Sequence, residues 1–223
     1  REAGRIIHQK DGLLYQAYGE RQGFAEWSIN RNDLNKCLAE EMKKYPHITV
    51  TYNTRCVGID FERRTLVLEN QNTKSREAKK VDILIGADGI HSAVRTAMEE
   101  KGLVEVTLDV MDWGYKNINI PAPHEGALPF RKDAFHLWSK KSAAVFGIPN
   151  WRGFFTSTIT LPLAGSDSFE SIRTKEACAE FFKQHVPDLY PYLESYVEDL
   201  MRQPAPPFTS LYTSKWHCRD FCL

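Results

Sequence analysis

The sequence lacks a surplus of either charge, since 29 Lys and Arg residues balance 29 Asp and Glu residues over 223 positions. A chain without a basic excess offers no electrostatic case for binding nucleic acid or an anionic membrane surface. It also lacks a run of about 18 apolar residues, the length that a membrane-spanning helix needs, although 42% of its residues are hydrophobic. These absences predict a globular chain with no membrane segment, folded as one large or two small domains.

Signatures of metal sites and disulfide frameworks are absent as well. The five cysteines form no Cys-x-x-Cys pair, and the seven histidines are scattered along the chain. A structural zinc site needs four clustered ligands, so the sequence predicts no bound metal. The odd number of cysteines favours reduced, mostly buried thiols in a cytosolic type of compartment.

Neither end of the sequence has the features of an ordinary chain terminus. It opens on Arg1 instead of Met, without an apolar targeting segment, and it closes on the apolar run Phe221-Cys222-Leu223. We therefore expect an internal piece of a longer protein.

Hydrophobic periodicity alternates between strand and helix patterns along the chain. A hairpin is predicted around Asp11-Gly12, and a helix is predicted from the capping residue Asn30 to Pro46. Further strands are predicted at 48–52, 56–68 and 103–163, a loop at 70–80, and helices at 168–185 and 187–201. This order predicts an α/β nucleotide-type domain, incomplete at its start, interleaved with an α+β domain built on an antiparallel sheet.

Residues 81–95 form the most informative segment. A near-continuous apolar run predicts a strand buried on both faces, which ends in Gly86-Ala87-Asp88-Gly89 and opens a helix. In open α/β folds, ligands bind at the carboxyl ends of the strands, where an Asp favours contacts with hydroxyl groups or water. The alternative is that Asp88-Gly89 is only a turn and that Ser92 only caps the helix.

This segment resembles a motif of the flavin-dependent aromatic hydroxylases, the class A monooxygenases. Gly86-Ala87-Asp88-Gly89-Ile90-His91-Ser92-Ala93-Val94-Arg95 is similar to the family's Asp-Gly motif, and residues 28–35 are similar to its Arg-x-x-Leu segment. Within the family, the segments 31–36, 44–46, 135–138 and 148–150 are most similar to the branch that hydroxylates kynurenine in tryptophan catabolism. The likeness runs in the same order through nearly the whole chain.

The resemblance implies a fold and a domain order. The fold would be α/β, with an incomplete Rossmann-like FAD-binding portion interleaved with an α+β substrate domain. Residues 1–30 would supply strands of the substrate domain, 31–102 part of the FAD-binding domain, 103–207 the substrate domain, and 208–223 strands that return to the FAD-binding domain.

Two residues match the positions that hold the substrate in this family. Arg5 matches an arginine that binds the carboxylate of the substrate. An arginine suits this task, since a guanidinium offers two parallel donors to a carboxylate. Tyr18 matches a tyrosine at the same end of the substrate. From the residues alone, Arg5 is one arginine on a strand, and a solvated surface position is the alternative.

Four further residues match cofactor contacts. These are Arg31 at the start of a helix, Cys56 where a strand ends, Asp88 in the Asp-Gly motif, and Ala93. Cys56 and Ala93 match backbone contacts, so the thiol of Cys56 would be incidental. The resemblance also places Phe135, Phe146 and Thr160 around an aromatic pocket, with ordinary sheet packing as the alternative.

The implied chemistry uses FAD, NADPH, O2 and a small aromatic amino acid as substrate, and no residue is predicted as a general acid or base. The family's Gly-x-Gly-x-x-Gly and Gly-Asp-Ala-Ala-His segments are absent, and Ser139-Lys140 follows Trp138 where Pro-Arg is expected. Two alternatives stay open: a related hydroxylase of another aromatic acid, and a non-catalytic fragment without flavin. The resemblance implies a location on the cytoplasmic side, and it leaves open an anchor of a longer parent protein in the mitochondrial outer membrane.

Overall fold

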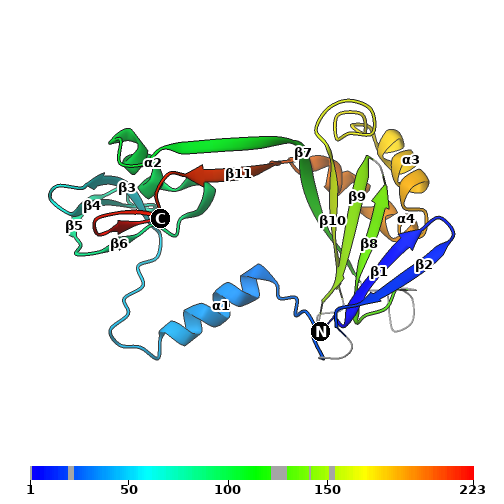
Figure 1. The fold of residues 1–223 in the computed structure, drawn as a ribbon, viewed down its shortest axis with the longest axis horizontal. Helices are drawn as coiled ribbons and strands as arrows, with labels where there is room; N and C mark the ends of the chain where they lie inside the picture. The colour runs from blue at the N-terminus through cyan, green and yellow to red at the C-terminus, as the bar shows by residue number, and fades with distance from the viewer. Residues whose placement is uncertain (1, 20–22, 122–129, 141, 151–153) are drawn as a thin grey trace. The chain divides into compact units, whose positions relative to one another are not determined.

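The computed structural model describes residues 2–19, 23–121, 130–140, 142–150 and 154–223. The chain divides into two compact units (Figure 1). The first unit holds residues 1–40 and 110–208, and the second holds residues 41–109 and 209–223. The mixed α/β fold predicted from the sequence is confirmed, whereas the assignment of residues 1–30, 31–102, 103–207 and 208–223 to a substrate and an FAD-binding domain stays a prediction.

A seven-stranded sheet with the order β11-β7-β10-β9-β8-β1-β2 forms the framework of the first unit, although residues 106–109 and 209–213 of its strands belong to the second unit. Its strands are β1 (Gly4–Gln9), β2 (Gly12–Ala17), β7 (Val106–Pro121), β8 (Ala134–Lys140), β9 (Ala143–Pro149), β10 (Phe154–Pro162) and β11 (Pro207–Thr213). Strands β7, β10, β9 and β8 pair antiparallel, as the alternation across 103–163 predicts. Strand β1 pairs antiparallel with β2 and parallel with β8, so the N-terminal hairpin completes one edge of the sheet.

One face of this sheet is covered by the helices that follow β10. They are α3 (Lys175–His185), α4 (Tyr190–Leu193), η2 (Glu194–Tyr196) and α5 (Val197–Arg202). Trp138, Val145, Phe155 and Ile159 of the sheet pack against helical residues such as Phe182. Thr174 begins α3, since its hydroxyl accepts a hydrogen bond from the Ala177 N–H at 3.2 Å.

The other face of the sheet, here called the open face, carries the alternate residues of each strand. They are Arg5, Ile7, Gln16, Asn117, Asn119, Phe135, Leu137, Phe146, Ile148, Thr156 and Thr158. All of them keep part or most of their surface accessible. Because side chains alternate along a strand, the core positions of β8 and β9 fix the remaining ones on the open face.

The second unit contains two small sheets and a helix. Strands β3 (Thr54–Asp60), β4 (Thr65–Asn70) and β5 (Arg76–Lys80) form an antiparallel sheet. Strands β6 (Leu84–Ile85) and β13 (Phe221–Cys222) pair parallel, and β12 (His217–Cys218) pairs with β13. The 3-10 turn η1 (Gly89–His91) leads into α2 (Ala93–Glu100), whose Val94 and Met98 pack against Val104 and Phe221.

Several local predictions are confirmed. The hairpin at Asp11-Gly12 and the hairpin between 56 and 68 are present. The helix predicted after Asn30 is α1 (Arg31–Met42), and the Asn30 side chain accepts a hydrogen bond from the Asn32 N–H at 2.9 Å.

Other local predictions are wrong. Residues 48–52 alternate like a strand but form none, because no described strand pairs with them and they are exposed. The predicted loop 70–80 contains β5, an all-exposed strand that rests on its pairing with β4 and not on a hydrophobic pattern. The long buried strand predicted after Val81 is only the two-residue strand β6 in the structure. Ile83 is 67% exposed and Ile85 is 69% exposed, so this segment is not buried.

The helix and cysteine predictions need correction as well. The helix predicted from Ser168 begins only at Lys175, since the hydroxyls of Ser168 and Ser171 stabilise a turn there. The helix predicted at 187–201 consists of α4, η2 and α5. All five thiols are free, but only Cys178 is buried, so the prediction of mostly buried thiols is wrong.

Candidate functional site

The loop between β6 and α2 places Asp88 at the start of the helix. The Asp88 Oδ2 atom accepts hydrogen bonds from the Ala93 N–H at 2.7 Å and from the Val94 N–H at 3.5 Å. Partial burial by itself would raise the pKa of Asp88, but hydrogen bonds from Ser92 and these backbone groups outweigh it and lower the pKa. The ionised carboxylate therefore stabilises the positive end of α2. The capping role of Ser92 is also present, since its Oγ accepts from the Arg95 N–H at 3.0 Å.

Arg95 and two glycines hold this loop in shape. The Arg95 guanidinium donates to the carbonyl of Gly89 at 3.0 Å and to the carbonyl of Ile90. Gly89 has a φ of 77°, which side chains disfavour. A Cβ on Gly86 would lie 2.8 Å from the Val94 Cβ, so β6 approaches α2 more closely than a side chain allows. Gly86, Asp88 and Gly89 thus shape the turn itself.

A cavity of about 510 Å³ lies between β3 and α2. Cys56 and Ala93 both line it, together with Arg55, Val57, Gly58, Ile59, Phe61, His91, Thr96, Ala97, Glu100 and Lys101. Cys56 does not stand at the end of its strand as predicted, because β3 continues to Asp60 through an irregularity in pairing between Cys56 and Gly58. The register leaves out Val57, and such a bulge turns backbone groups away from the strand pairing.

The lining of this cavity fits part of a flavin cofactor. Asp88 disfavours a phosphate at the start of α2, because a carboxylate already accepts the Ala93 N–H group. The bulged backbone at Cys56 and the small side chain of Ala93 leave room for a flat or hydroxyl-bearing group. The cavity thus brings Cys56 and Ala93 together, while Asp88 adjoins it through the Ala93 N–H group, and contact of these three residues with FAD stays a prediction.

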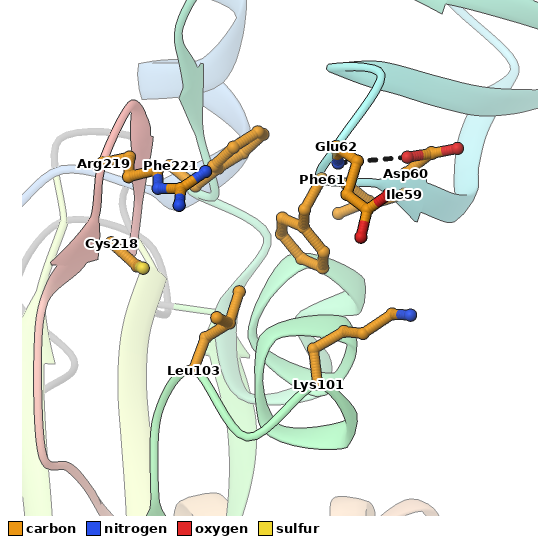
Figure 2. Close-up of a pocket in the computed structure, with 9 residues that line it drawn as sticks. All are labelled: Ile59, Asp60, Phe61, Glu62, Lys101, Leu103, Cys218, Arg219 and Phe221. Atoms are coloured by element: carbon orange, nitrogen blue, oxygen red, sulfur yellow. Dashed lines mark hydrogen bonds between the residues drawn. The ribbon is translucent and has the colours of Figure 1, made fainter.

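A neighbouring cavity of about 570 Å³ contains none of the residues predicted from the sequence (Figure 2). It is lined by Ile59, Asp60, Phe61, Glu62, Lys101, Leu103, Cys218, Arg219 and Phe221. The rings of Phe61 and Phe221 meet edge to face with centroids 4.9 Å apart. Because Phe61 and Lys101 also line the first cavity, the two hollows are adjacent in the second unit.

On the open face of the first unit, Arg5 lies between Gln16 of β2 and Phe135 of β8. The Arg5 side chain is exposed, and its Nε–H donates to the Gln16 Oε1 atom at 2.7 Å. The rings of Phe135 and Phe146 have centroids 5.7 Å apart on the same face. The structure thus brings together a guanidinium and the aromatic pair that the sequence singled out.

Tyr18 belongs to the same hairpin. Its N–H donates to the Ala3 carbonyl at 3.0 Å, which extends the register of β1 and β2 and directs Tyr18 to the face of Arg5. Partial burial, and then the nearby carboxylates of Glu26 and Glu2, raise the pKa of Tyr18. Its hydroxyl therefore stays protonated and can donate a hydrogen bond at neutral pH.

For two further predicted site residues, the structure supports the predicted role less directly. Thr160 is buried, and its hydroxyl already donates to the Ala144 carbonyl at 2.8 Å, so it serves sheet packing in this structure. Arg31 is the first residue of α1, as predicted, and it is exposed. Its contact with FAD stays a prediction.

A buried histidine network on the helix side of the sheet was not predicted. His8 lies with Nδ1 2.6 Å from an Asp188 carboxylate oxygen and with Nε2 2.9 Å from the His136 Nδ1 atom. The His136 Nε2 atom is 2.9 Å from the Arg131 carbonyl, which can only accept. Trp138 donates to the other Asp188 oxygen at 2.8 Å.

The partners fix where the protons of this network lie. His136 must donate from Nε2, so its Nδ1 accepts from His8 Nε2 when His136 is neutral. The His8 Nδ1 atom faces the Asp188 carboxylate, whose pKa partial burial would raise but hydrogen bonds from His8 and Trp138 lower. Burial lowers the pKa of His136 to about 4, which keeps it neutral. No sequence signal joins these residues, because His8 and Asp188 are 180 positions apart.

Comparison with known proteins agrees with this geometry. The sequence profile described as "FAD binding domain" matches residues 17–190. The chain belongs to this FAD-binding family. Within the ranges that the structure describes, no helix of this family member is long and apolar enough to cross a membrane.

Two curated relatives of this FAD-binding chain carry the name kynurenine 3-monooxygenase. The protein of Legionella pneumophila (strain Lens) is 30% identical over 220 residues, which cover 98% of this chain and 48% of the relative. The protein of Dictyostelium discoideum is 29% identical over 215 residues, which cover 96% of this chain and 46% of the relative. The chain spans about half the length of the curated relatives it matches.

Solved structures share the fold at lower sequence identity. The tetrameric form of 2-methyl-3-hydroxypyridine-5-carboxylic acid oxygenase superposes with a TM-score of 0.71 at 14% identity, over all of this chain and 56% of that chain. A flavoprotein/dehydrogenase from Cytophaga hutchinsonii gives a TM-score of 0.66 at 14% identity, over 99% of this chain and 53% of that chain. These likenesses establish the fold of the FAD-binding family for this chain.

Proposed function

We propose that this chain supplies part of the active site of an FAD-dependent, NADPH-using aromatic hydroxylase that converts L-kynurenine to its 3-hydroxy product with O2. The observation that carries the proposal is the open face, where the exposed guanidinium of Arg5 lies beside Phe135. An aromatic amino acid presents a carboxylate at one end and a flat ring at the other. The names of the relatives of Legionella and Dictyostelium support kynurenine as that amino acid.

Each residue has a definite part in this proposal. Arg5 would bind the carboxylate with paired donors, and the protonated hydroxyl of Tyr18 would donate to the same group. Phe135 and Phe146 would hold the ring by offset contact. Bound FAD would supply the redox chemistry that activates O2.

The cofactor contacts follow the geometry of the second unit. Cys56 and Ala93 would meet FAD through backbone and small-side-chain contacts in their shared cavity. The ionised Asp88 would accept a hydrogen bond from a hydroxyl group of the cofactor. Arg31, at the start of α1 in the first unit, is proposed as a cationic contact of FAD on the resemblance alone.

The test is oxidation of NADPH by a purified full-length version of the protein, supplied with FAD and L-kynurenine, compared with a panel of phenolic acids, because this chain alone is expected to be inactive. We expect NADPH oxidation stimulated by L-kynurenine, with 3-hydroxykynurenine identified by mass spectrometry. Stimulation by a phenolic acid alone would identify a related hydroxylase of another aromatic acid. A colourless protein that gains no flavin absorbance with FAD would favour the non-catalytic alternative.

Replacement of Arg5 tests the substrate anchor. We expect Arg5→Ala to raise the KM for L-kynurenine at least tenfold, since loss of a charge-assisted contact costs about 1.5–3 kcal/mol. Arg173→Ala is the matched control, because Arg173 is an exposed arginine on the helix side of the unit. Its Nη2 atom lies 3.6 Å from the Glu170 Oε1 atom. An unchanged KM in Arg5→Ala would remove Arg5 from the substrate site.

A further inference from the structure

The hydrogen bond between Arg5 and Gln16 determines which edge of the guanidinium can receive a ligand. The two residues are direct cross-strand partners in the β1–β2 hairpin. The Arg5 Nε atom carries a single hydrogen, and it donates this hydrogen to Gln16 Oε1 at 2.7 Å. The edge formed by Nε and one terminal nitrogen is therefore already engaged.

The remaining edge still offers two parallel donors. A carboxylate can pair with a guanidinium either at the Nε side or end-on at the two Nη atoms, and only the second arrangement leaves the Gln16 contact intact. Arg5 is exposed, and in the described part of the chain no carboxylate lies within ion-pair distance of it. Its positive charge is thus available to an incoming anion.

The chemistry of Gln16 suits an orienting partner. An amide oxygen accepts the Nε–H without carrying a charge, whereas an Asp or Glu at this position would form an ion pair with Arg5. Gln16 therefore restricts the rotation of the guanidinium and leaves its charge uncompensated. Phe135 is the register partner of Arg5 on the strand on the other side, so Arg5 stands between a glutamine and a phenylalanine on the same face of the sheet.

We propose that Gln16 is a positioning residue: it fixes Arg5 so that the carboxylate of an aromatic amino acid binds end-on to the two Nη groups. This inference rests on the proposed function, in which Arg5 binds the substrate carboxylate. It assigns to Gln16 a part in selecting amino acids over aromatic compounds that lack a carboxylate.

The test compares binding of L-kynurenine with binding of its decarboxylated analogue, by titration of the FAD-supplied protein. We expect Gln16→Met, which keeps the side-chain length but removes the acceptor, to raise the Kd for L-kynurenine about three- to tenfold. Gln16→Glu is expected to raise it more than tenfold, because its carboxylate competes for Arg5. The Kd for the decarboxylated analogue stays within about twofold in both variants.

A second readout reports on the contact itself. The Nε–H resonance of Arg5, assigned by its loss in Arg5→Lys, is expected to shift and to exchange faster with water in Gln16→Met. Gln9→Met is the matched control, since Gln9 is an exposed glutamine on the same hairpin. A structural defect in the hairpin would instead weaken the binding of both ligands to the same extent.

The outcomes separate this inference from the proposed function. If the unsubstituted protein prefers L-kynurenine and the Gln16 variants keep both that preference and the Arg5 resonance, Gln16 has no positioning role and only this inference is overturned. If the unsubstituted protein binds L-kynurenine no better than the decarboxylated analogue, the proposed role of Arg5 fails, and the role of Gln16 fails with it.

Discussion

His136 shows how a single residue limits the pH range of the fold. Burial lowers its pKa from 6.5 to about 4, and the hydrogen bond to the Arg131 carbonyl only partly opposes this. In the unfolded chain, the histidine keeps its ordinary pKa near 6.5. Between these two values the unfolded chain binds a proton that the folded chain does not, so acidification favours unfolding.

The free energy of unfolding of the first unit is therefore expected to fall as the pH falls from 6.5 to about 4. Each unit of pKa difference corresponds to about 1.4 kcal/mol. Urea denaturation at several pH values across this window measures the slope. His136→Gln keeps a donor toward Arg131 and an acceptor toward His8, and it should flatten the slope. An equal slope in both proteins would show that another group is responsible.

Single residues also mark the limit of inference from the sequence. Asp88 and Ala93 could be predicted, because the turn that holds them is encoded by adjacent residues such as Gly89. The contact of His8 with Asp188 could not, because His8 lies on β1 and Asp188 lies just before α4, 180 positions later in the chain.

At the scale of elements, predictions held where side-chain pattern and pairing agree. The alternation across 103–163 is matched by strands with a buried and an open face. Residues 48–52 alternate equally well but have no described pairing partner, while β5 has a partner and almost no apolar pattern. Strand formation here depends on distant pairing that a local pattern does not report.

Strand β9 offers a test of packing between elements. Gly147 faces the core, and a Cβ at this position would lie 2.1 Å from the Phe155 ring. Gly147→Ala must displace a ring that also stacks on Phe130, so we expect a loss of about 1–3 kcal/mol in the free energy of unfolding. Denaturant titration measures this loss.

Gly58→Ala provides the comparison for this substitution. Its Cβ would lie 3.5 Å from the Val67 side chain, which is ordinary contact. We expect a change of less than about 0.5 kcal/mol there. Equal effects of the two alanines would contradict the close approach of Phe155 to β9.

At the scale of the whole molecule, substitutions in the second unit test whether its cavity binds the cofactor. Ala93→Trp would fill the cavity that Ala93 shares with Cys56, and we expect it to weaken FAD binding at least tenfold. Cys56→Ser should change the affinity less than about twofold, because the proposed contact is through the backbone. Quenching of FAD fluorescence measures both constants, and full affinity in Ala93→Trp would place the cofactor elsewhere.

The parallel pairing of β1 with β8 has a consequence for the synthesis of the protein. Ile7 pairs with Leu137, so the N-terminal hairpin reaches its place in the sheet only after some 130 further residues have been made. At 5–20 residues per second, the ribosome needs on the order of 10 s for this stretch. During that time the edge of β1 that will pair with β8 has no partner strand. Contacts of such sequence separation slow folding, and an unpaired edge is prone to association with other chains.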